Sequence, residues 1–217
     1  MTTLRLYSYW RSSCSWRVRI GLLWKGLPFE YRTVHLLKDG GQQKSPEYTR
    51  LNPMQRVPVL EVEENGRVRH FSESMAILEY LEERWPDPPL LPRDLGDRAL
   101  ARQAAEIVNS GIQPFQNTNV QKRLKHELHA DEKAWARHFI GHGLGALEAL
   151  LHSTAGKYAI GDAVGLADCF LVPQLYHARR FEVDLAPLPT LTRIEAACMA
   201  LPAFQAAHAE RQPDSEA

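Results

Sequence analysis

Hydrophobic and polar residues alternate in several short segments of the first third of the chain, a pattern typical of half-buried strands. Residues 4–9 alternate in this way, and residues 29–34, 57–62 and 68–71 are also predicted as strands. Between the first two, residues 18–27 have the apolar spacing of a helix. From Ser74 onward, apolar residues recur every three or four positions, which predicts a second helix that ends near Trp85. The predicted order is therefore βαβ followed by ββα.

A proline-rich run, WPDPPLLP, follows this second helix. Proline cannot continue a helix, and several prolines in succession make a stiff connector. Beyond the run, strand patterns vanish and apolar residues recur only at helical spacing. We therefore predict an α/β domain over residues 1–85, a linker over 86–93 and an all-helical domain over 94–217. The tail after Pro202, rich in alanine and polar residues, is expected to be loosely held.

Composition and charge exclude several classes of protein. The chain has 217 residues, 44% of them hydrophobic, which is enough for a substantial core. Lysine plus arginine equals aspartate plus glutamate at 26 each, so no global field would attract nucleic acid or an acidic membrane surface. An anionic ligand must therefore be bound by local charge. No segment approaches the roughly 20 apolar residues that span a bilayer, so we expect no membrane association.

The three cysteines, Cys14, Cys169 and Cys198, are far apart and follow no metal or redox pairing pattern. A disulfide framework is not expected, and a reducing compartment suits such a chain. Because the N-terminus also lacks the pattern of a secretory leader, we predict a cytoplasmic protein.

Three patterns that imitate functional motifs are interpreted as structural. The run GHGLGA matches a dinucleotide-binding fingerprint, but it lies inside a helical pattern with no strand before it, and we interpret it as close helix packing. His138 and His142 have the spacing of a metal pair without a further ligand nearby, so surface histidines and no metal site are predicted. Asp168 is interpreted as a helix-capping residue.

The run RSSCSWRVRI places unusual chemistry where the first helix should begin. Ser12 and Ser13 stand where an N-cap belongs, and the simplest interpretation is that one of them only caps the helix. However, Cys14 lies there too, beside Arg11 and Arg17, at the positive end of the helix dipole, which stabilises an anion or thiolate. Arg17 occupies the second position of a C-x-x-C motif, so dithiol chemistry is excluded. A thiolate supplied by a ligand remains possible.

Two further segments could recognise a peptide-like ligand. In NPMQRVPVL, Val57 precedes Pro58 at the start of a predicted strand, where an extended peptide could pair with the backbone of Val57. In SES, Glu73 and Ser74 offer a hydroxyl, a backbone N–H and a helix N-terminus to a carboxylate. The alternative for this second segment is simple helix capping.

Five runs in this order, RSSCSWRVRI, LNPMQRVPVL, SESMAILEYLEE, SGIQPFQN and GDAVGLADCFLVPQ, resemble the zeta-class glutathione transferases over nearly the whole chain. The S-S-C-x-x-R-V-R run is specific to that class, whereas the V-P and E-S pairs belong to glutathione transferases generally. The resemblance implies a thioredoxin-like N-terminal domain that carries glutathione, a helical C-terminal domain that shapes the acceptor pocket, a cis bond before Pro58 and a homodimer. The best-known members of the class are maleylacetoacetate isomerases, with bacterial maleylpyruvate isomerases close by.

The resemblance also implies roles for individual residues. Ser12, Ser13 and Cys14 would surround the glutathione sulfur. Gln43 and Val57 would bind the cysteinyl and glycyl backbone, Glu73 and Ser74 would bind the γ-glutamyl end, and Gln113 with Asn117 to Asn119 would line the domain interface. The complete set expected to bind glutathione is Ser12, Ser13, Cys14, Arg17, Gln43, Val57, Glu73, Ser74, Gln113, Asn117, Thr118 and Asn119.

Two residues depart from the pattern of the class. Glu73 stands where the class usually has glutamine, which would weaken or retune glutathione binding. Gly165 replaces a Ser/Thr helix cap, a change that costs only about a few tenths of a kcal/mol because glycine is a tolerable N-cap. Asp168, three residues later, can still reach back to backbone N–H groups.

We therefore expect a glutathione-dependent cis–trans isomerase whose substrate is a small dicarboxylic keto acid. Its catalytic residues would be Ser12, Ser13, Cys14, Arg11 and Arg180. The serines would lower the pKa of the glutathione thiol, with the stronger effect expected at Ser12, and the arginines would stabilise charge on the substrate. Arg180 is favoured over Arg179 because it continues one helical face that contains Leu166, Phe170, Pro173 and His177.

The sequence is also compatible with two other functions. The same activated thiolate would serve a conjugating or haloacid-processing transferase, in which glutathione is consumed. A non-catalytic glutathione-fold module used for protein interaction is the other alternative. The sequence also leaves open the choice between maleylacetoacetate and maleylpyruvate, which differ only at the end remote from the cis double bond.

Overall fold

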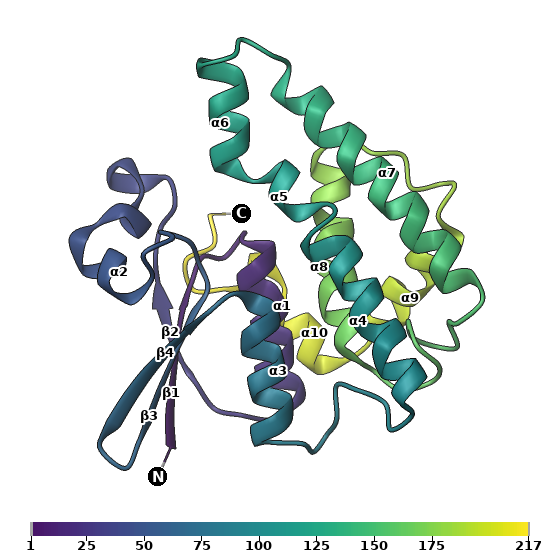
Figure 1. Cartoon of the computed structure of the whole chain (residues 1–217), viewed down its shortest axis with the longest axis horizontal. Helices are drawn as coiled ribbons and strands as arrows, with labels where there is room; N and C mark the ends of the chain where they lie inside the picture. Colours follow the sequence, from purple (N-terminus) through teal and green to yellow (C-terminus); the bar gives the residue numbers. More distant parts are fainter. Residues whose placement is uncertain (1, 217) are drawn as a thin grey trace. The chain divides into compact units, whose positions relative to one another are not determined.

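The computed structural model describes residues 2–216, which fall into two compact units. Unit 1 comprises the residues up to Pro89 together with those from Pro202 onward, and unit 2 comprises Leu90–Leu201. Figure 1 shows the strands of unit 1 and the helices of both units. None of the helices within residues 2–216 combines the length and apolar character needed to cross a membrane.

Unit 1 has a thioredoxin-like core, as the resemblance implied. Its main elements are β1 (Thr2–Ser8), α1 (Ser13–Trp24), β2 (Glu30–Thr33), β3 (Val59–Glu64), β4 (Arg67–Ser72) and α3 (Ser74–Arg84). The strands lie in the order β2-β1-β3-β4, with β1 parallel to β2 and the two other pairs antiparallel. The predicted βαβ–ββα order is therefore confirmed.

The alternation in β1 separates two different sheet faces. Leu6 of β1 is paired with Leu60 of β3, and both side chains are completely buried. Ile20 of α1 and Ile77 of α3 are also completely buried, and these two helices pack against each other. Burial of such side chains is the main favourable term for this unit, at about 1.5–3 kcal/mol for each large apolar side chain.

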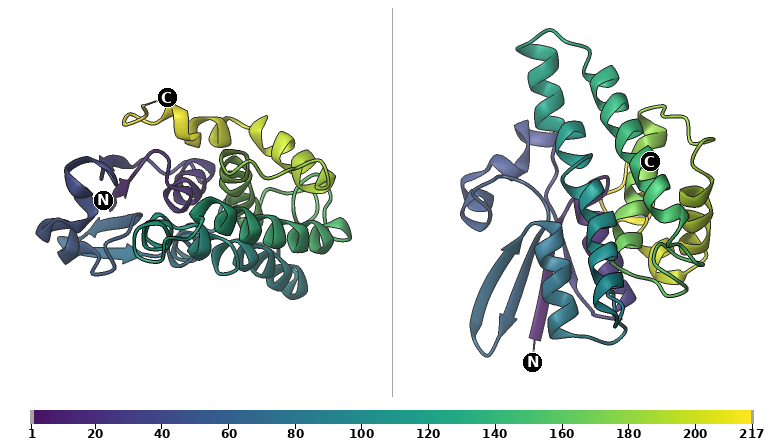
Figure 2. Two further views of the ribbon diagram at one scale, coloured as in Figure 1. Left: turned by 90° about the horizontal axis from the view of Figure 1, so that it is seen from above. Right: turned by 45° about the vertical axis from the view of Figure 1, so that its right-hand side comes forward.

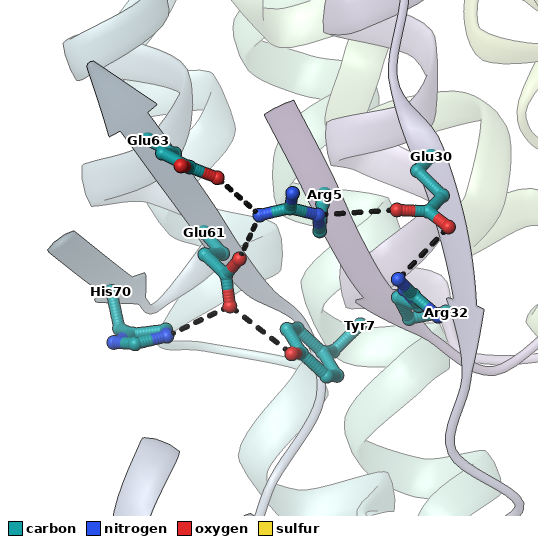
Figure 3. A network of polar contacts seen from close by, with 7 residues as sticks. All are labelled: Arg5, Tyr7, Glu30, Arg32, Glu61, Glu63 and His70. Carbon is teal, nitrogen blue, oxygen red and sulfur yellow. Dashed lines mark hydrogen bonds and ion pairs between the residues drawn. The ribbon is translucent and has the colours of Figure 1, made fainter. Parts of the chain in front are cut away.

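The opposite face of the sheet carries a charged network (Figure 3). The guanidinium of Arg5 pairs with the carboxylates of Glu61 and Glu63. Glu61 also accepts hydrogen bonds from the hydroxyl of Tyr7, at 3.1 Å, and from Nε2 of His70, at 3.0 Å. Partial burial raises the pKa of Glu61, but these hydrogen bonds outweigh it, and the net pKa is lowered.

The segment between β2 and β3 contains three short helices that the sequence patterns did not predict. They are the 3₁₀ turns η1 (Lys38–Gly40) and η2 (Gln42–Lys44) and the helix α2 (Pro46–Leu51). Ser45 caps α2 by accepting a hydrogen bond from the N–H of Tyr48, and Pro46 occupies the first helical turn. The run Ser-Pro-Glu at 45–47 was thus a readable helix start.

The backbone at the start of the proline-rich run contacts the buried side chain of Lys25. Nζ of Lys25 pairs with the carboxylate of Glu82 at 2.7 Å and donates to the carbonyls of Trp85 and Pro88. The charge of Lys25 is therefore compensated inside unit 1, and the same three contacts fix the backbone that follows α3.

Unit 2 is helical, and its residues 90–201 contain no strand. Its helices are α4 (Leu95–Asn109), α5 (Gln113–Gln116), α6 (Thr118–His126), α7 (Glu132–His152), α8 (Leu166–Arg180) and α9 (Pro189–Met199). Helix α4 packs against α7 and α8, as the views in Figure 2 show. A Cβ on Gly143 would lie 2.3 Å from Cγ1 of Ile112, so the GHGLGA run serves close packing, as interpreted from the sequence. His138 and His142 are exposed, also as expected.

Helix α8 begins on the capping arrangement that the sequence suggested. Asp168 accepts hydrogen bonds from the N–H groups of Gly165, at 2.8 Å, and Ala159, at 3.0 Å. Complete burial raises the pKa of Asp168 to about 6, against the opposing effect of these backbone hydrogen bonds. Glycine also suits position 165 sterically, because a Cβ there would lie 3.1 Å from the carbonyl oxygen of Leu90.

The last part of the chain differs from expectation. Residues from Pro202 onward were assigned to the helical domain and expected to be loosely held, but they pack with unit 1. Helix α10 (Pro202–Ala207) contacts α1, and Nε of Arg19 donates to the carbonyl of Ala207 at 3.1 Å. Phe204 and Ala207 are completely buried. The physical reason is that this short helix has its own apolar face, which α1 covers.

Candidate functional site

The predicted site residues of unit 1 share one end of its sheet. Tyr7 near the end of β1 pairs with Val59 at the start of β3, which pairs with Ser72 at the end of β4. The segments connected to these three strand ends therefore begin side by side. They are Tyr9–Cys14 after β1, Val57–Pro58 before β3 and Glu73–Ser74 after β4. The end of β2 is adjacent as well, because Ser8 pairs with Thr33.

Ser12 is the N-cap of α1. Its Oγ accepts a hydrogen bond from the N–H of Ser15 at 3.2 Å, so the capping role is confirmed. This bond uses a lone pair of the hydroxyl and leaves its O–H able to donate to an anion. Ser13 is buried and Cys14 is partly exposed in the first turn of α1, where backbone N–H groups lack intrahelical partners. The arrangement can stabilise a negative charge placed before the helix.

Arg17 connects the beginnings of the two helices. It is completely buried, and its Nη1 donates to the hydroxyl of Ser74 at 3.1 Å. The structure thus brings together two residues, Arg17 and Ser74, that were assigned to the same ligand. A buried positive charge at this place favours an anion.

Arg19 is a residue whose contribution the sequence did not specify. Its guanidinium is completely buried and donates to the carbonyls of Tyr9 and Trp10 and to the hydroxyl of Ser8. Burial lowers the pKa of Arg19 to about 10. These contacts fix the backbone that leads into the N-cap residue Ser12. The R-V-R spacing places Arg17 and Arg19 on the same helix, where the first contacts Ser74 and the second contacts this loop.

The two other segments have unusual backbone geometry. The Val57–Pro58 peptide bond is cis, as the resemblance implied, and Val57 is buried. Glu73 has a positive φ of 69° and is the N-cap of α3, but its side chain makes no capping hydrogen bond. Non-glycine residues with positive φ are costly, and they concentrate at binding and catalytic sites. The capping alternative therefore does not account for the exposed carboxylate of Glu73.

Gln43 lies in η2 and is buried, with 8% of its surface exposed. Its buried Oε1 accepts no hydrogen bond from residues 2–216, so a ligand N–H group would satisfy it. The preceding Gly41 has a φ of 105°, and a Cβ there would lie 2.7 Å from Nε2 of Gln43. Gly41 is thus required for the position of this amide.

The predicted residues of unit 2 lie on α5 and α6. Gln113 is partly buried at the start of α5, while Thr118 and Asn119 are exposed in the first turn of α6. Asn117 caps α6, since its Oδ1 accepts from the N–H of Asn119 at 3.0 Å. For Asn117 the structure therefore supplies a structural role; its role toward a ligand stays a prediction.

A buried amide pair connects α5 to α8 and was not predicted. Nε2 of Gln116 donates to Oε1 of Gln174 at 2.8 Å, and Nε2 of Gln174 donates back to Oε1 of Gln116 at 3.1 Å. Both side chains are buried, and each amide partly satisfies the other. Glutamine in an otherwise apolar helical stripe was the signal, but its partner 58 residues away could not be identified from the sequence.

Arg179 and Arg180 end α8 in different environments. Arg179 makes a bidentate ion pair with Glu195 of α9, which accounts for it structurally. The stripe that should lead to Arg180 is buried at Leu166, Phe170 and Pro173. Arg180 itself is exposed, whereas we expected it to point inward, because Ala178 is the last buried residue of α8 and the helix ends at Arg180.

These features fit a small thiol peptide better than a metal ion. Within residues 2–216, no group of three or more His, Cys, Asp or Glu side chains is arranged to hold a metal. In contrast, unit 1 offers a helix N-terminus with a hydroxyl donor, a backbone edge at Val57, an unsatisfied amide oxygen on Gln43 and the hydroxyl of Ser74. Backbone edges and amide groups recognise the peptide part of such a ligand, and the helix N-terminus suits a thiolate.

Comparisons with known proteins agree with this chemistry. Residues 11–84 match the family model of the glutathione S-transferase N-terminal domain. Maleylacetoacetate isomerase of Rattus norvegicus is 50% identical over 212 residues, which are 98% of this chain and 95% of the relative.

Solved structures are similar over the full length. Maleylacetoacetate isomerase from Anaeromyxobacter dehalogenans 2CP-1, with glutathione bound in its active site, is 57% identical with a TM-score of 0.92, over 98% of both chains. The same enzyme has also been solved with dicarboxyethyl glutathione and citrate in the active site. A maleyl pyruvate isomerase, described as a bacterial glutathione transferase of the zeta class, is 42% identical with a TM-score of 0.91, over 97% of this chain and 99% of that one.

Proposed function

The chain belongs to the zeta-class glutathione transferases and maleylacetoacetate isomerases, and we propose that it catalyses glutathione-dependent isomerisation of maleylacetoacetate to its trans, fumaryl isomer. The observation that carries the proposal is the convergence, at one end of the sheet of unit 1, of Ser12–Cys14, the cis Val57–Pro58 bond and Glu73–Ser74. Maleylacetoacetate is preferred over maleylpyruvate because the maleylacetoacetate isomerases described above are 50% and 57% identical to this chain, against 42% for the maleyl pyruvate isomerase.

Glutathione, when bound, supplies a thiolate that adds reversibly to the cis double bond, so that rotation about a single bond can precede elimination. The chain's own residues make this chemistry feasible at neutral pH. A free thiol has a pKa of about 8.5 and is mostly protonated there. The O–H of Ser12 and the first N–H groups of α1 stabilise the charged form, which lowers that pKa.

Binding and orientation would be divided among the other residues. Val57 offers its backbone, Gln43 its amide and Ser74 its hydroxyl to the peptide part of glutathione, while buried Arg17 holds Ser74 in place. Arg11 and Arg180 are assigned to the substrate, because addition pushes negative charge onto the conjugated oxygens and the substrate carries carboxylates. Gln113, Asn117, Thr118 and Asn119 of unit 2 stay predicted glutathione-binding residues.

The test is to incubate the protein with maleylacetoacetate and with maleylpyruvate, each with and without glutathione, and to follow loss of the maleyl chromophore. We expect loss only with glutathione present, and faster loss with maleylacetoacetate. Full-rate isomerisation without glutathione would contradict the proposal. Net loss of glutathione during turnover would favour a conjugating or haloacid-processing transferase instead.

An oligomeric state and a compartment are also proposed for the chain. We propose a homodimer, which sedimentation at working concentration would measure directly. We also propose a cytoplasmic location, where a reducing environment would keep the three free cysteines as thiols.

A further inference from the structure

The C-terminal segment of the chain crosses the loops that carry the candidate site. Gln212 anchors it to the end of α10, since Nε2 of Gln212 donates to the carbonyls of Ala206 and His208. Two residues later, Asp214 accepts hydrogen bonds from the backbone N–H of Trp10 at 3.0 Å and from the hydroxyl of Tyr31 at 2.7 Å.

The carboxylate of Glu216 contacts a second loop, which comprises residues 35–43. Oε1 of Glu216 lies 3.2 Å from Nε2 of His35 and 2.7 Å from Nζ of Lys38. Nδ1 of His35 accepts the N–H groups of Leu37 and Lys38, so the ring proton is on Nε2 and is donated to Glu216. The pairing with Lys38 and His35 lowers the pKa of Glu216.

The loop that begins at His35 ends at Gln43. Its two ends are closed by reciprocal hydrogen bonds, because the N–H of His35 donates to Oε1 of Gln42 and the N–H of Gln42 donates to the carbonyl of His35. Between them, Asp39, Gly40 and Gly41 all have positive φ, which is costly for Asp39, while the two glycines lose much conformational entropy when the loop is ordered. A contact from outside the loop, such as that of Glu216, therefore adds to its order.

We propose that Asp214 and Glu216 are positioning residues for glutathione, and that they hold the 8–12 loop and the 35–43 loop in their binding conformation. The inference rests on the proposed function, in which Ser12 and Gln43 contact glutathione. Asp214 acts on the first loop through the N–H of Trp10, and Glu216 acts on the second through His35 and Lys38. The acidic tail thereby couples the C-terminus to cofactor affinity.

The test compares Asp214→Asn/Glu216→Gln, and Glu216→Gln alone, with Glu210→Gln, an exposed acid of the same tail outside this cluster. In the double variant we expect the KM for glutathione to rise about three- to tenfold, with kcat nearly unchanged, because the loops are less ordered before binding. Calorimetric titration with glutathione should give the same loss of affinity. Glu210→Gln should match the wild type.

Hydrogen–deuterium exchange provides a readout that needs no glutathione. Amides of residues 35–43 should exchange faster in both Glu216 variants, while those of β3 and α3 stay protected. Unchanged KM together with unchanged exchange would overturn the proposal, as would an equal effect of Glu210→Gln. If the double variant fails to fold, Glu216→Gln decides, because the Glu216 side chain is 47% exposed. A wild type that binds no glutathione would instead contradict the proposed function.

Discussion

Ser12 combines two roles in one hydroxyl, since a lone pair caps α1 and the hydrogen can stabilise a thiolate. Ser12→Ala should raise the pKa of the bound glutathione thiol toward the free value of about 8.5 and lower kcat about 10²-fold. The pKa is read from the ultraviolet absorbance of the thiolate during a pH titration of the complex. Ser13→Ala should act in the same direction but less strongly, because Ser13 is buried in the first turn of α1.

Cys14→Ala is the matched comparison for the serine variants. The attacking sulfur belongs to glutathione in this account, so loss of the Cys14 thiol should have a milder effect on turnover. If the Ser12→Ala/Ser13→Ala protein kept wild-type turnover, the serines would only be structural. Complete inactivation of Cys14→Ala with glutathione binding intact would make Cys14 the nucleophile.

Arg180 separates an isomerase from a general conjugating enzyme. A guanidinium binds a carboxylate bidentately, which methionine cannot imitate. Arg180→Met should reduce turnover of the maleyl acid by about 10²-fold and leave conjugation of a small neutral electrophile close to normal. Steady-state kinetics with both substrates measure the difference.

Arg179→Met is the internal control, since Arg179 pairs with Glu195 and is half exposed. Loss of such a pair costs about 0–1 kcal/mol of stability and should spare both reactions. Equal damage to charged and neutral substrates in Arg180→Met would assign Arg180 to the helix end only, and Arg11 would be the next candidate for the carboxylate.

At the scale of elements, the start of α8 depends on Asp168. Its carboxylate satisfies two backbone N–H groups, those of Gly165 and Ala159, in a completely buried place. Asp168→Ala would leave both donors unpaired and should lower the free energy of unfolding by about 2–4 kcal/mol. Urea denaturation measures the change, and a loss below about 0.5 kcal/mol would contradict this role. Asp131→Ala, at the exposed cap of α7, should cost only about 1 kcal/mol.

The sheet network gives a prediction for pH. The pKa of Glu61 is lower in the folded protein than in the unfolded chain, so its stabilising contribution is present above the unfolded pKa and is lost as pH falls through the folded pKa. Glu61→Gln should therefore destabilise the protein by about 1 kcal/mol at neutral pH and by less in acid. A constant difference across an acid titration of stability would contradict this assignment.

Local periodicity predicted some elements well and others poorly for physical reasons. The strand β1 and the helix α3 have one buried and one more exposed side, so their patterns were readable. Helix α1 was predicted over 18–27 but spans Ser13–Trp24, because it is buried on nearly all sides and includes the buried Arg17 and Arg19. When a helix buries charged residues as well as apolar ones, its sequence does not show one apolar face and one polar face.

The sequence predicted only those parts of the site whose residues are close together along the chain. The clustering of Ser12, Ser13 and Cys14 at a helix start could be read from one run of residues, and the structure places the V-P and E-S segments at the same sheet end. The contact of Trp10 with Asp214 joins residues 204 positions apart. No period or motif indicates such a pair, so the role of the tail could come only from the fold.

In the whole molecule, the residues from Pro202 onward belong to unit 1, which gives the C-terminal segment a proposed role in glutathione binding. The chain returns to the unit in which it started, and its end contacts the loops around the candidate site. A deletion or fusion at the C-terminus should therefore affect glutathione affinity more than it affects the helical unit.

Glutathione acts in the proposed reaction as a cofactor that is returned unchanged. The most direct measurement supplies the protein with glutathione in small amount and a large molar excess of maleylacetoacetate, then quantifies the fumaryl product and the remaining thiol together. We expect complete conversion of the acid, with all of the glutathione recovered as free thiol. Conversion that stops when the acid consumed equals the glutathione added, with the thiol gone, would contradict it.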